Sequence, residues 1–322
     1  MKKKYFIWTF LALVLSGVFA VNNSLAYWIW TPEIGKWINP KYAVKSSPQE
    51  QFDWAMRLYE EKQYPKAADE FSKLVFNYST SKYAPSALYY GGLCYEANDY
   101  YYKAYQSYDR ILKEYPTFEN IDEIIEREFK IGEAFLGGEK RKAMGMKIFP
   151  SSESAIEIFS SIAENAPFSK YGAQAQFKVG VALKKAGKYS LAKESFDKVI
   201  LNYPDSTVVE QARYESADCS FLASGESAYE QTVTKQAIDE FNQLLSEEKD
   251  DVELSEKAGK KLLSLREKDA EHLYNIAKFY ERIKKDKSAV IYYEEIIAKY
   301  PQTSFAKKAQ ERLNEREQND EK

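Results

Sequence analysis

Hydrophobic and small residues recur along this chain at two fixed helical spacings. Six times an alanine is followed four residues later by an aromatic residue, which places both side chains on one face of a helix. Upstream of each alanine, an aromatic residue stands three positions before a small residue, again on one helical face. The alanine pairs are Ala67/Phe71, Ala104/Tyr108, Ala155/Phe159, Ala192/Phe196, Ala237/Phe241 and Ala289/Tyr293. The upstream pairs are Phe52/Ala55, Tyr89/Gly92, Phe129/Gly132, Phe177/Gly180, Tyr214/Ala217 and Tyr274/Ala277. The pattern therefore predicts six helix pairs.

Proline marks the end of the second helix in most pairs. It stands twelve residues after the alanine at Pro116, Pro167, Pro204 and Pro301, while Ser79 and Lys249 occupy the other two positions. The small residues should let paired helices approach closely, and the aromatic rings should fill the space between them.

The spacing between alanines shows where the repeats are extended. The shortest alanine-to-alanine step is 37 residues. The third repeat carries a basic insert from Gly137 to Ser151, and the fifth is lengthened around residues 224–234. Residues 251–268 carry apolar side chains at helical spacing, so we expect this segment to run into the helix of Tyr274 as one long rod.

The amino terminus has the pattern of a secretory signal. Three lysines precede an apolar run from Tyr5 to Val21, and small residues follow at 24–26, so we expect a signal peptide over residues 1–26. An uncleaved membrane anchor is the alternative, since the run is just short of a membrane span. Residues 15–17 are similar to the start of a lipoprotein box, but Val18 stands where the lipidated cysteine would be, so we expect no lipid anchor there.

Residues 27–46 are rich in tryptophan. Alternating aromatic residues flank a Pro-Glu-x-Gly turn, which predicts a small hairpin with Trp28 and Trp30 near Trp37. One interpretation is that the hairpin caps the exposed end of the first repeat, as a repeat array requires. The other is that it is a docking element for a partner.

Candidate chemistry is sparse. The net charge is −3, and nothing in the charge distribution favours nucleic acid. We expect Cys94 and Cys219 to be buried, unpaired thiols, because they fall in different repeats. The only histidine, His272, lies on a predicted helix, and the Cys and His counts exclude a zinc cluster of useful spacing. We therefore expect no catalytic residue, no metal and no cofactor, and interpret the chain as a non-enzyme.

The helix pairs resemble the tetratricopeptide repeat, a helix-turn-helix unit of 34 residues. This predicts an all-α, superhelical solenoid of about six helix pairs preceded by the tryptophan-rich hairpin. The expected organisation is a signal peptide at 1–26, the tryptophan-rich segment at 27–46, repeats 1–5 at 47–250, the long helix and last repeat at 251–313, and a charged tail at 314–322.

The chain resembles the BamD family, also called ComL, over about residues 47–313. The resemblance is carried by the signal sequence, the Tyr-Pro linkers, of which Tyr203 begins a Tyr-Pro-x-Ser sequence, the insert within a repeat and the long helix containing Arg266. The resemblance implies a periplasmic scaffold at the outer membrane, in the machinery that inserts β-barrel proteins. Its partners would be unfolded outer-membrane proteins, bound by the amino-terminal repeats, and the barrel-forming subunit, bound by the carboxy-terminal repeats. The membrane attachment would then be peripheral, through a protein partner.

Two further interpretations stay open. The chain is alternatively another cell-envelope adaptor of the same repeat type, serving the Tol-Pal system or a secretion or polysaccharide-export complex, or an enzyme-associated regulator. The aromatic residues before the small positions line either a peptide groove or the core between repeats. The candidate groove residues are Phe52, Met56, Tyr59, Tyr89, Tyr90 and Phe129. Because no Lys/Asn pair occupies the groove positions, an aromatic-rich, extended ligand fits better than a clamped carboxylate.

Overall fold

A computed structural model describes residues 29–31, 36–38, 43–139, 141–143, 146–149, 151–226, 231–247 and 251–320. The predicted signal peptide, Val18 and Trp28 lie outside these residues. The chain divides into two compact units, the first ending at Ala87 and the second beginning at Leu88.

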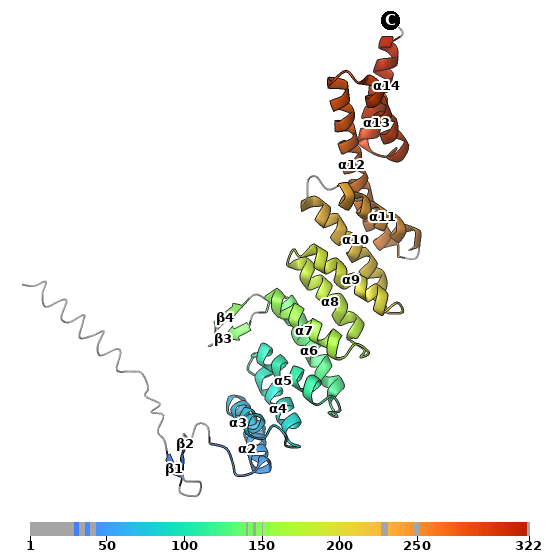
Figure 1. Cartoon of the computed structure of the whole chain (residues 1–322). Coiled ribbons are helices and arrows are strands. Elements are labelled where there is room, and N and C mark those ends of the chain that lie inside the picture. The colour runs from blue at the N-terminus through green and yellow to red at the C-terminus, as the bar shows by residue number, and fades with distance from the viewer. Residues whose placement is uncertain are drawn as a thin grey trace, which may run out of the picture. The chain divides into compact units, whose positions relative to one another are not determined.

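Helices dominate the described residues, and they follow the predicted pairs (Figure 1). The six pairs are α2 (Pro48–Glu60) with α3 (Tyr64–Asn77), α4 (Ala84–Glu96) with α5 (Tyr101–Glu114), α6 (Ile121–Leu136) with α7 (Ser151–Asn165), α8 (Gly172–Lys185) with α9 (Tyr189–Asn202), α10 (Val209–Glu226) with α11 (Gln231–Glu247), and α12 (Val252–Arg282) with α13 (Asp286–Lys299). A last helix, α14 (Ser304–Asp320), extends into the segment assigned as a charged tail. Within the second unit, each helix from α5 onward packs on the next. The predicted all-α repeat solenoid is confirmed.

Helix ends are set by local signals that repeat with the array. Ser47 caps α2, its hydroxyl accepting a hydrogen bond from the Glu50 amide at 3.2 Å, and Pro48 follows at the first helical position. Tyr78, Tyr115, Tyr203 and Tyr300 end four of the second helices with nearly the same backbone angles, φ −129° to −136°. Proline comes next in three of these cases and cannot continue the helix.

The turns inside the repeats share a left-handed residue. Gly187 has φ +74°, and Lys62, Asp99 and Lys284 adopt φ between +56° and +59° at the corresponding turns. A side chain in this region costs roughly 1–2 kcal/mol. The recurrence of this turn where glycine is missing shows that packing of the helix pair, rather than the turn residue, determines the connection.

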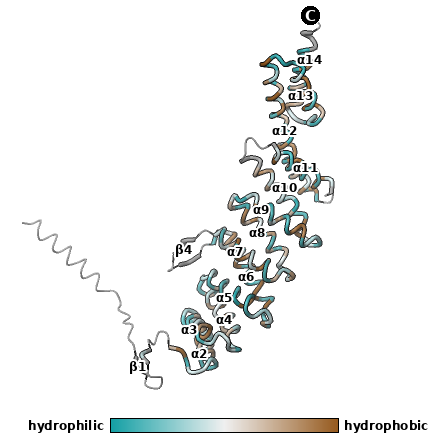
Figure 2. The backbone as a smooth tube through the Cα atoms, in the orientation of Figure 1, coloured by the Kyte–Doolittle hydropathy of each residue, from teal (hydrophilic) through white to brown (hydrophobic). Residues whose placement is uncertain are grey.

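Small residues and aromatic rings pack as the pattern predicts. The six alanines of the second helices are fully buried, and the aromatic residues four positions later are fully buried as well. Figure 2 shows hydrophobic and hydrophilic stretches alternating along the helices, as expected for elements with one buried face.

Helix α12 is the uninterrupted rod that the sequence predicted, and it serves two cores. Its first half contributes Ala258, Leu262 and Leu265 to a cluster with α10 and α11. Its second half contributes Leu273 and Ala277 to a cluster with α13 and α14. The long helix therefore couples the fifth repeat to the sixth.

Two antiparallel hairpins accompany the helices. Strands β1 (Ile29–Thr31) and β2 (Lys36–Ile38) form the predicted tryptophan hairpin, with Trp30 opposite Trp37. Strands β3 (Arg141–Ala143) and β4 (Met146–Phe149) form a hairpin inside the basic insert between α6 and α7 (Figure 1). The sequence located this insert but assigned it no secondary structure.

Candidate functional site

Three rings of the predicted aromatic ladder are buried within their repeats, and the other three, Phe52, Tyr214 and Tyr274, are partly exposed. Tyr89, Phe129 and Phe177 are 8%, 6% and 6% exposed. The Phe129 ring lies 5.3 Å from that of Phe159 on the partner helix and stacks at 4.8 Å on Tyr171 from the following linker. The packing thus supports the core interpretation for these rings.

The same arrangement recurs in other repeats. Phe52 lies 5.8 Å from Phe71 and 5.4 Å from Tyr83, and Tyr89 lies 5.9 Å from Phe118. Tyr274 contacts Tyr293 and Phe305, each at 5.5 Å. Each of these ladder rings therefore contacts an aromatic ring in the linker that follows its repeat or at the start of the next helix. Phe52 and Tyr274 also contact an aromatic ring on the partner helix of their own repeat. Aromatic pairs prefer such tilted and edge-on contacts.

Four candidate groove residues keep part of their side chains exposed. They are Phe52, Met56, Tyr59 and Tyr90. The Tyr59 ring contacts Tyr64 at 5.7 Å, and Tyr90 contacts Tyr89 at 5.3 Å. Met56 and Tyr59 stand three residues apart on α2, so they share one face of the helix. Peptide binding by these residues stays a prediction.

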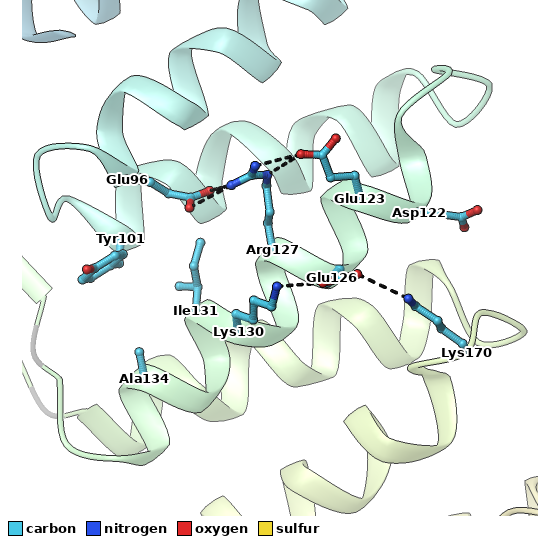
Figure 3. A pocket seen from close by; sticks show the side chains of 10 residues that line it. All are labelled: Glu96, Tyr101, Asp122, Glu123, Glu126, Arg127, Lys130, Ile131, Ala134 and Lys170. Atoms are coloured by element: carbon cyan, nitrogen blue, oxygen red, sulfur yellow. Dashed lines mark hydrogen bonds and ion pairs between the residues drawn. The ribbon is translucent and has the colours of Figure 1, made fainter. Parts of the chain in front are cut away.

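A charged cleft of ≈ 560 Å³ opens in the second unit (Figure 3). Helix α6 supplies most of its lining, Glu96 and Tyr101 come from the α4–α5 pair, and Lys170 comes from the linker before α8. The sequence did not identify this cleft. The Glu123/Arg127 and Glu126/Lys130 spacings of four residues were its local signals, whereas Glu96 and Lys170 lie far away along the chain.

Arg127 holds the centre of the cleft between two carboxylates. Its guanidinium donates to Glu96 at 3.1 Å and to Glu123 at 2.8–2.9 Å. Burial opposes the charged form, but the Glu123 hydrogen bonds and the Glu96 charge outweigh it and raise the Arg127 pKa. Two tyrosines complete the network, because Tyr108 donates to Glu96 at 2.5 Å and Tyr89 donates to Glu123 at 3.0 Å. Burial, followed by the Glu123 hydrogen bond, raises the pKa of Tyr89 to about 12.

Glu126 forms the second charge group of the cleft. It accepts from Lys130 at 2.7 Å and from Lys170 at 3.3 Å (Figure 3). These two hydrogen bonds lower the pKa of Glu126 to about 2. Glu126 and its two lysines are therefore ionised at neutral pH and form an exposed ion-pair group at the rim of the cleft.

The remaining candidate chemical groups lie apart from one another. Cys94 and Cys219 are buried, and burial raises the pKa of each thiol to about 12, which keeps both protonated at neutral pH. His272 is exposed on α12. Among the residues that the structure describes, no cluster of three or more His, Cys, Asp or Glu side chains could hold a metal ion. No helix in the described part of the chain combines the length and apolarity of a membrane span.

The tryptophan hairpin presents its rings to solvent. Trp30 and Trp37 meet edge to face at 5.7 Å and are 47% and 61% exposed. A cap and a docking element both use such a pair, and the role of Trp28, Trp30 and Trp37 stays a prediction.

Comparison with protein families gives two matches. The model of YfiO, described as an outer membrane lipoprotein, matches residues 150–320, and a tetratricopeptide-repeat model matches residues 86–117. Comparison with curated proteins gives no significant match.

Solved structures similar to this chain are tetratricopeptide-repeat proteins. A thermophilic tetratricopeptide-repeat protein from Thermus thermophilus is 16% identical to this chain, with a TM-score of 0.33. The match covers 67% of this chain and 100% of the other. The carboxy-terminal part of one from Cytophaga hutchinsonii is 17% identical, covers 82% and 87%, and has a TM-score of 0.33. YrrB, described as having an unusual peptide-binding site, is 19% identical, covers 65% and 90%, and has a TM-score of 0.31.

Proposed function

The chain belongs to the YfiO family of outer membrane lipoproteins, which is the BamD family of the sequence resemblance, and we propose that it is a non-enzymatic scaffold of the β-barrel assembly machinery. The family match from residue 150 to 320 carries this proposal, because it spans α7 to α14 and so covers more than a generic repeat. In this proposal the protein acts on the periplasmic face of the outer membrane.

The carboxy-terminal repeats are proposed to hold the barrel-forming subunit. Phe279 and Ile283, at the end of α12 and just after it, are 49% and 44% exposed, and their spacing of four residues brings them together on one face. Paired apolar side chains exposed on a helix are the kind of anchor that protein interfaces bury.

The amino-terminal repeats are proposed to bind unfolded outer-membrane proteins. Met56 and Tyr59 support this role within the first unit, and Tyr90 supports it within the second, because each is partly exposed beside an aromatic or apolar core. Barrel strands alternate apolar and polar residues and carry aromatic residues at their ends, so such side chains offer them matching contacts.

Scaffolding also accounts for the paired charges. Glu96, Glu123 and Glu126 of the cleft in Figure 3 pair with Arg127, Lys130 and Lys170, and both thiols are buried and protonated. With valine at position 18, we propose that attachment to the membrane is peripheral and runs through the protein partner.

The experiment that tests this function is affinity purification from cell-envelope extract with the wild-type chain and two variants. The wild type is expected to retain the barrel-forming subunit, and the double variant Phe279→Ser with Ile283→Ser is expected to lose it. Val252→Ser is the control, because Val252 is 76% exposed on the same helix but lies at its other end. Recovery of Tol-Pal, secretion or polysaccharide-export components in place of the barrel subunit would contradict the proposal and favour the adaptor alternative.

A further inference from the structure

A second hollow lies in the first unit, between α2 and α3. We call it the end groove. It has a volume of ≈ 970 Å³, and its lining includes Trp54, Leu58, Asp69, Glu70, Lys73 and Phe76. Leu58 is buried at its base, whereas the ring of Phe76 is 87% exposed. An aromatic ring exposed to this extent beside an apolar hollow marks a surface that gains free energy when covered.

Repeat register shows which face of the first repeat this groove occupies. Trp54 stands one position before the small residue Ala55, and the matched residues of the later repeats are Gly91, Ile131, Val179, Ser216 and Ile276. The first four of these are buried, with Ile131, Val179 and Ser216 at 4%, 7% and 5% exposed, and Ile276 is partly exposed. Ser216 donates to Asp197 of α9 at 2.6 Å, so this position faces the second helix of the preceding repeat.

The α3 side of the groove follows the same rule. Three of its residues match positions that later repeats use to contact the repeat before them. Asp69 matches Glu157, which accepts from Tyr102 of α5 at 2.7 Å. Glu70 matches Glu240, which pairs with Lys193 of α9 at 3.2 Å, and Lys73 matches Ser161, which donates to Asp109 of α5. Trp54, Asp69, Glu70 and Lys73 therefore lie on the inter-repeat surface of the first repeat, the face on which a preceding repeat would pack. Phe76 lies at the edge of this surface, because its match in the fourth repeat, Leu201, is 79% exposed.

The chain itself brings a candidate occupant to this surface. Lys45 is fixed at the first repeat, because its carbonyl accepts from the Tyr78 hydroxyl at 2.7 Å and its ammonium lies 4.9 Å from the centre of the Trp54 ring. Strand β2 ends at Ile38, only seven residues earlier. Seven extended residues reach at most about 25 Å. The tryptophan hairpin is thus tethered within about 25 Å of Lys45, which lies beside Trp54 of the end groove.

The hairpin also has the matching chemistry. Its cross-strand pair, Trp30 with Trp37, presents two large rings that are about half exposed or more. Trp54 and Phe76 offer ring surfaces for edge-on and stacked contacts, each of which adds to the free energy of burying apolar area. A two-stranded hairpin is marginal in water and gains stability by packing on a helix.

We propose that the end groove is the docking site of the tryptophan hairpin, which takes the place of a preceding repeat and closes the amino-terminal end of the array. Trp30 and Trp37 pack against Trp54 and Phe76 in this arrangement. The inference is independent of the proposed role in barrel assembly, since it concerns a contact within the chain.

A double-mutant cycle measured by hydrogen exchange tests the proposal on the full chain. The double variant Trp30→Ala with Trp37→Ala should speed exchange of the α2 and α3 amides about tenfold, which corresponds to the loss of an aromatic contact. Phe76→Ala should have a similar effect alone and add almost nothing in the hairpin variant. Leu201→Ala is the matched control, because Leu201 occupies the position of Phe76 in the fourth repeat and is 79% exposed. Its effect should be small and additive.

Two outcomes would overturn the proposal. Additive effects of the Phe76 and hairpin substitutions would mean that the two sites do not touch. A mass that rises with protein concentration in light scattering, and falls back to that of one chain in Phe76→Ala, would instead assign the end groove to a second copy.

Discussion

Gly92 on α4 lies directly against the ring of Tyr108 on α5. A Cβ atom added at Gly92 would stand 2.3 Å from Cε1 of that ring, well inside van der Waals contact. Gly132 meets Phe159 and Gly180 meets Phe196 in the same way, with added Cβ atoms at 2.8 Å and 2.6 Å. The close approach of these helix pairs thus depends on a missing side chain opposite a large ring.

Gly92→Ala is expected to destabilise the protein, although alanine is the better helix former. Overpacking lowers the free energy of unfolding by about 1–3 kcal/mol, and the higher helix propensity of alanine offsets roughly 1 kcal/mol of that loss. The urea midpoint should therefore fall. Gly259→Ala is the control, because Gly259 lies inside α12 with no atom within 4 Å of an added Cβ, and it should stabilise the chain by about 0.4–1 kcal/mol. A higher midpoint for Gly92→Ala would show that the Tyr108 ring can move aside.

Phe129→Ala should separate the core and groove interpretations of the aromatic ladder. The ring packs between Phe159 and Tyr171, so its loss is expected to lower the free energy of unfolding by about 3–5 kcal/mol. Phe168→Ala is the control, since Phe168 is 99% exposed and should be close to neutral. A melting temperature unchanged in Phe129→Ala, together with weaker binding of aromatic-ended barrel peptides, would favour the groove.

Glu128 is a buried carboxyl at a position where two other repeats carry glutamine. Gln51 and Gln176, also four residues before the small position, donate to the backbone carbonyls of Glu70 at 3.0 Å and Ser195 at 3.2 Å. Glu128 is fully buried, and among the described residues neither of its carboxylate oxygens has a hydrogen-bond partner. Burial, and then the negative charge of Asp109, raise the pKa of Glu128 well above its usual value, with Lys113 opposing them.

Glu128→Gln is therefore expected to change the pH dependence of stability. The folded state favours the neutral acid, so Glu128 adds its full contribution to the free energy of unfolding below the pKa of the unfolded chain, about 4.3. This contribution is lost as pH rises toward the pKa of the folded state, by up to about 1.4 kcal/mol per pH unit. In urea titrations, the free energy of unfolding of the variant should rise relative to that of the wild type as pH rises above about 4. Gln51→Glu, at a fully buried site beside the Glu70 carboxylate, should introduce the same dependence. Identical pH profiles for wild type and Glu128→Gln would contradict the assignment.

Truncation within α12 is expected to depend on which of its two clusters is removed. A chain ending at residue 268 keeps Leu262 and Leu265 against Phe241, whereas one ending at 250 uncovers that cluster. Each buried leucine contributes about 1.5–3 kcal/mol, so the longer chain should melt at the higher temperature by circular dichroism. Both should stay helical, because stability in a repeat array is approximately a sum of neighbouring terms. Equal melting temperatures would show that the first half of α12 adds nothing to the fifth repeat.

The sequence alone determined the six helix pairs, their boundaries at the Tyr-Pro linkers, the Trp30/Trp37 hairpin and the long α12. Each of these depends on residues a few positions apart, where helix and hairpin geometry fixes which side chains meet. The alanine/aromatic spacing is read directly from the chain for that reason.

Tertiary structure decided what depends on residues far apart in the sequence. Tyr171, 42 positions after Phe129, stacks on the Phe129 ring, a contact that favours the core interpretation and that no local pattern predicts. The same holds for the bond from Arg127 to Glu96. Periodicity shows on which face of its helix a side chain lies. The residue that covers that face is determined by packing between repeats. Because this packing joins residues far apart in the sequence, local spacing does not predict it.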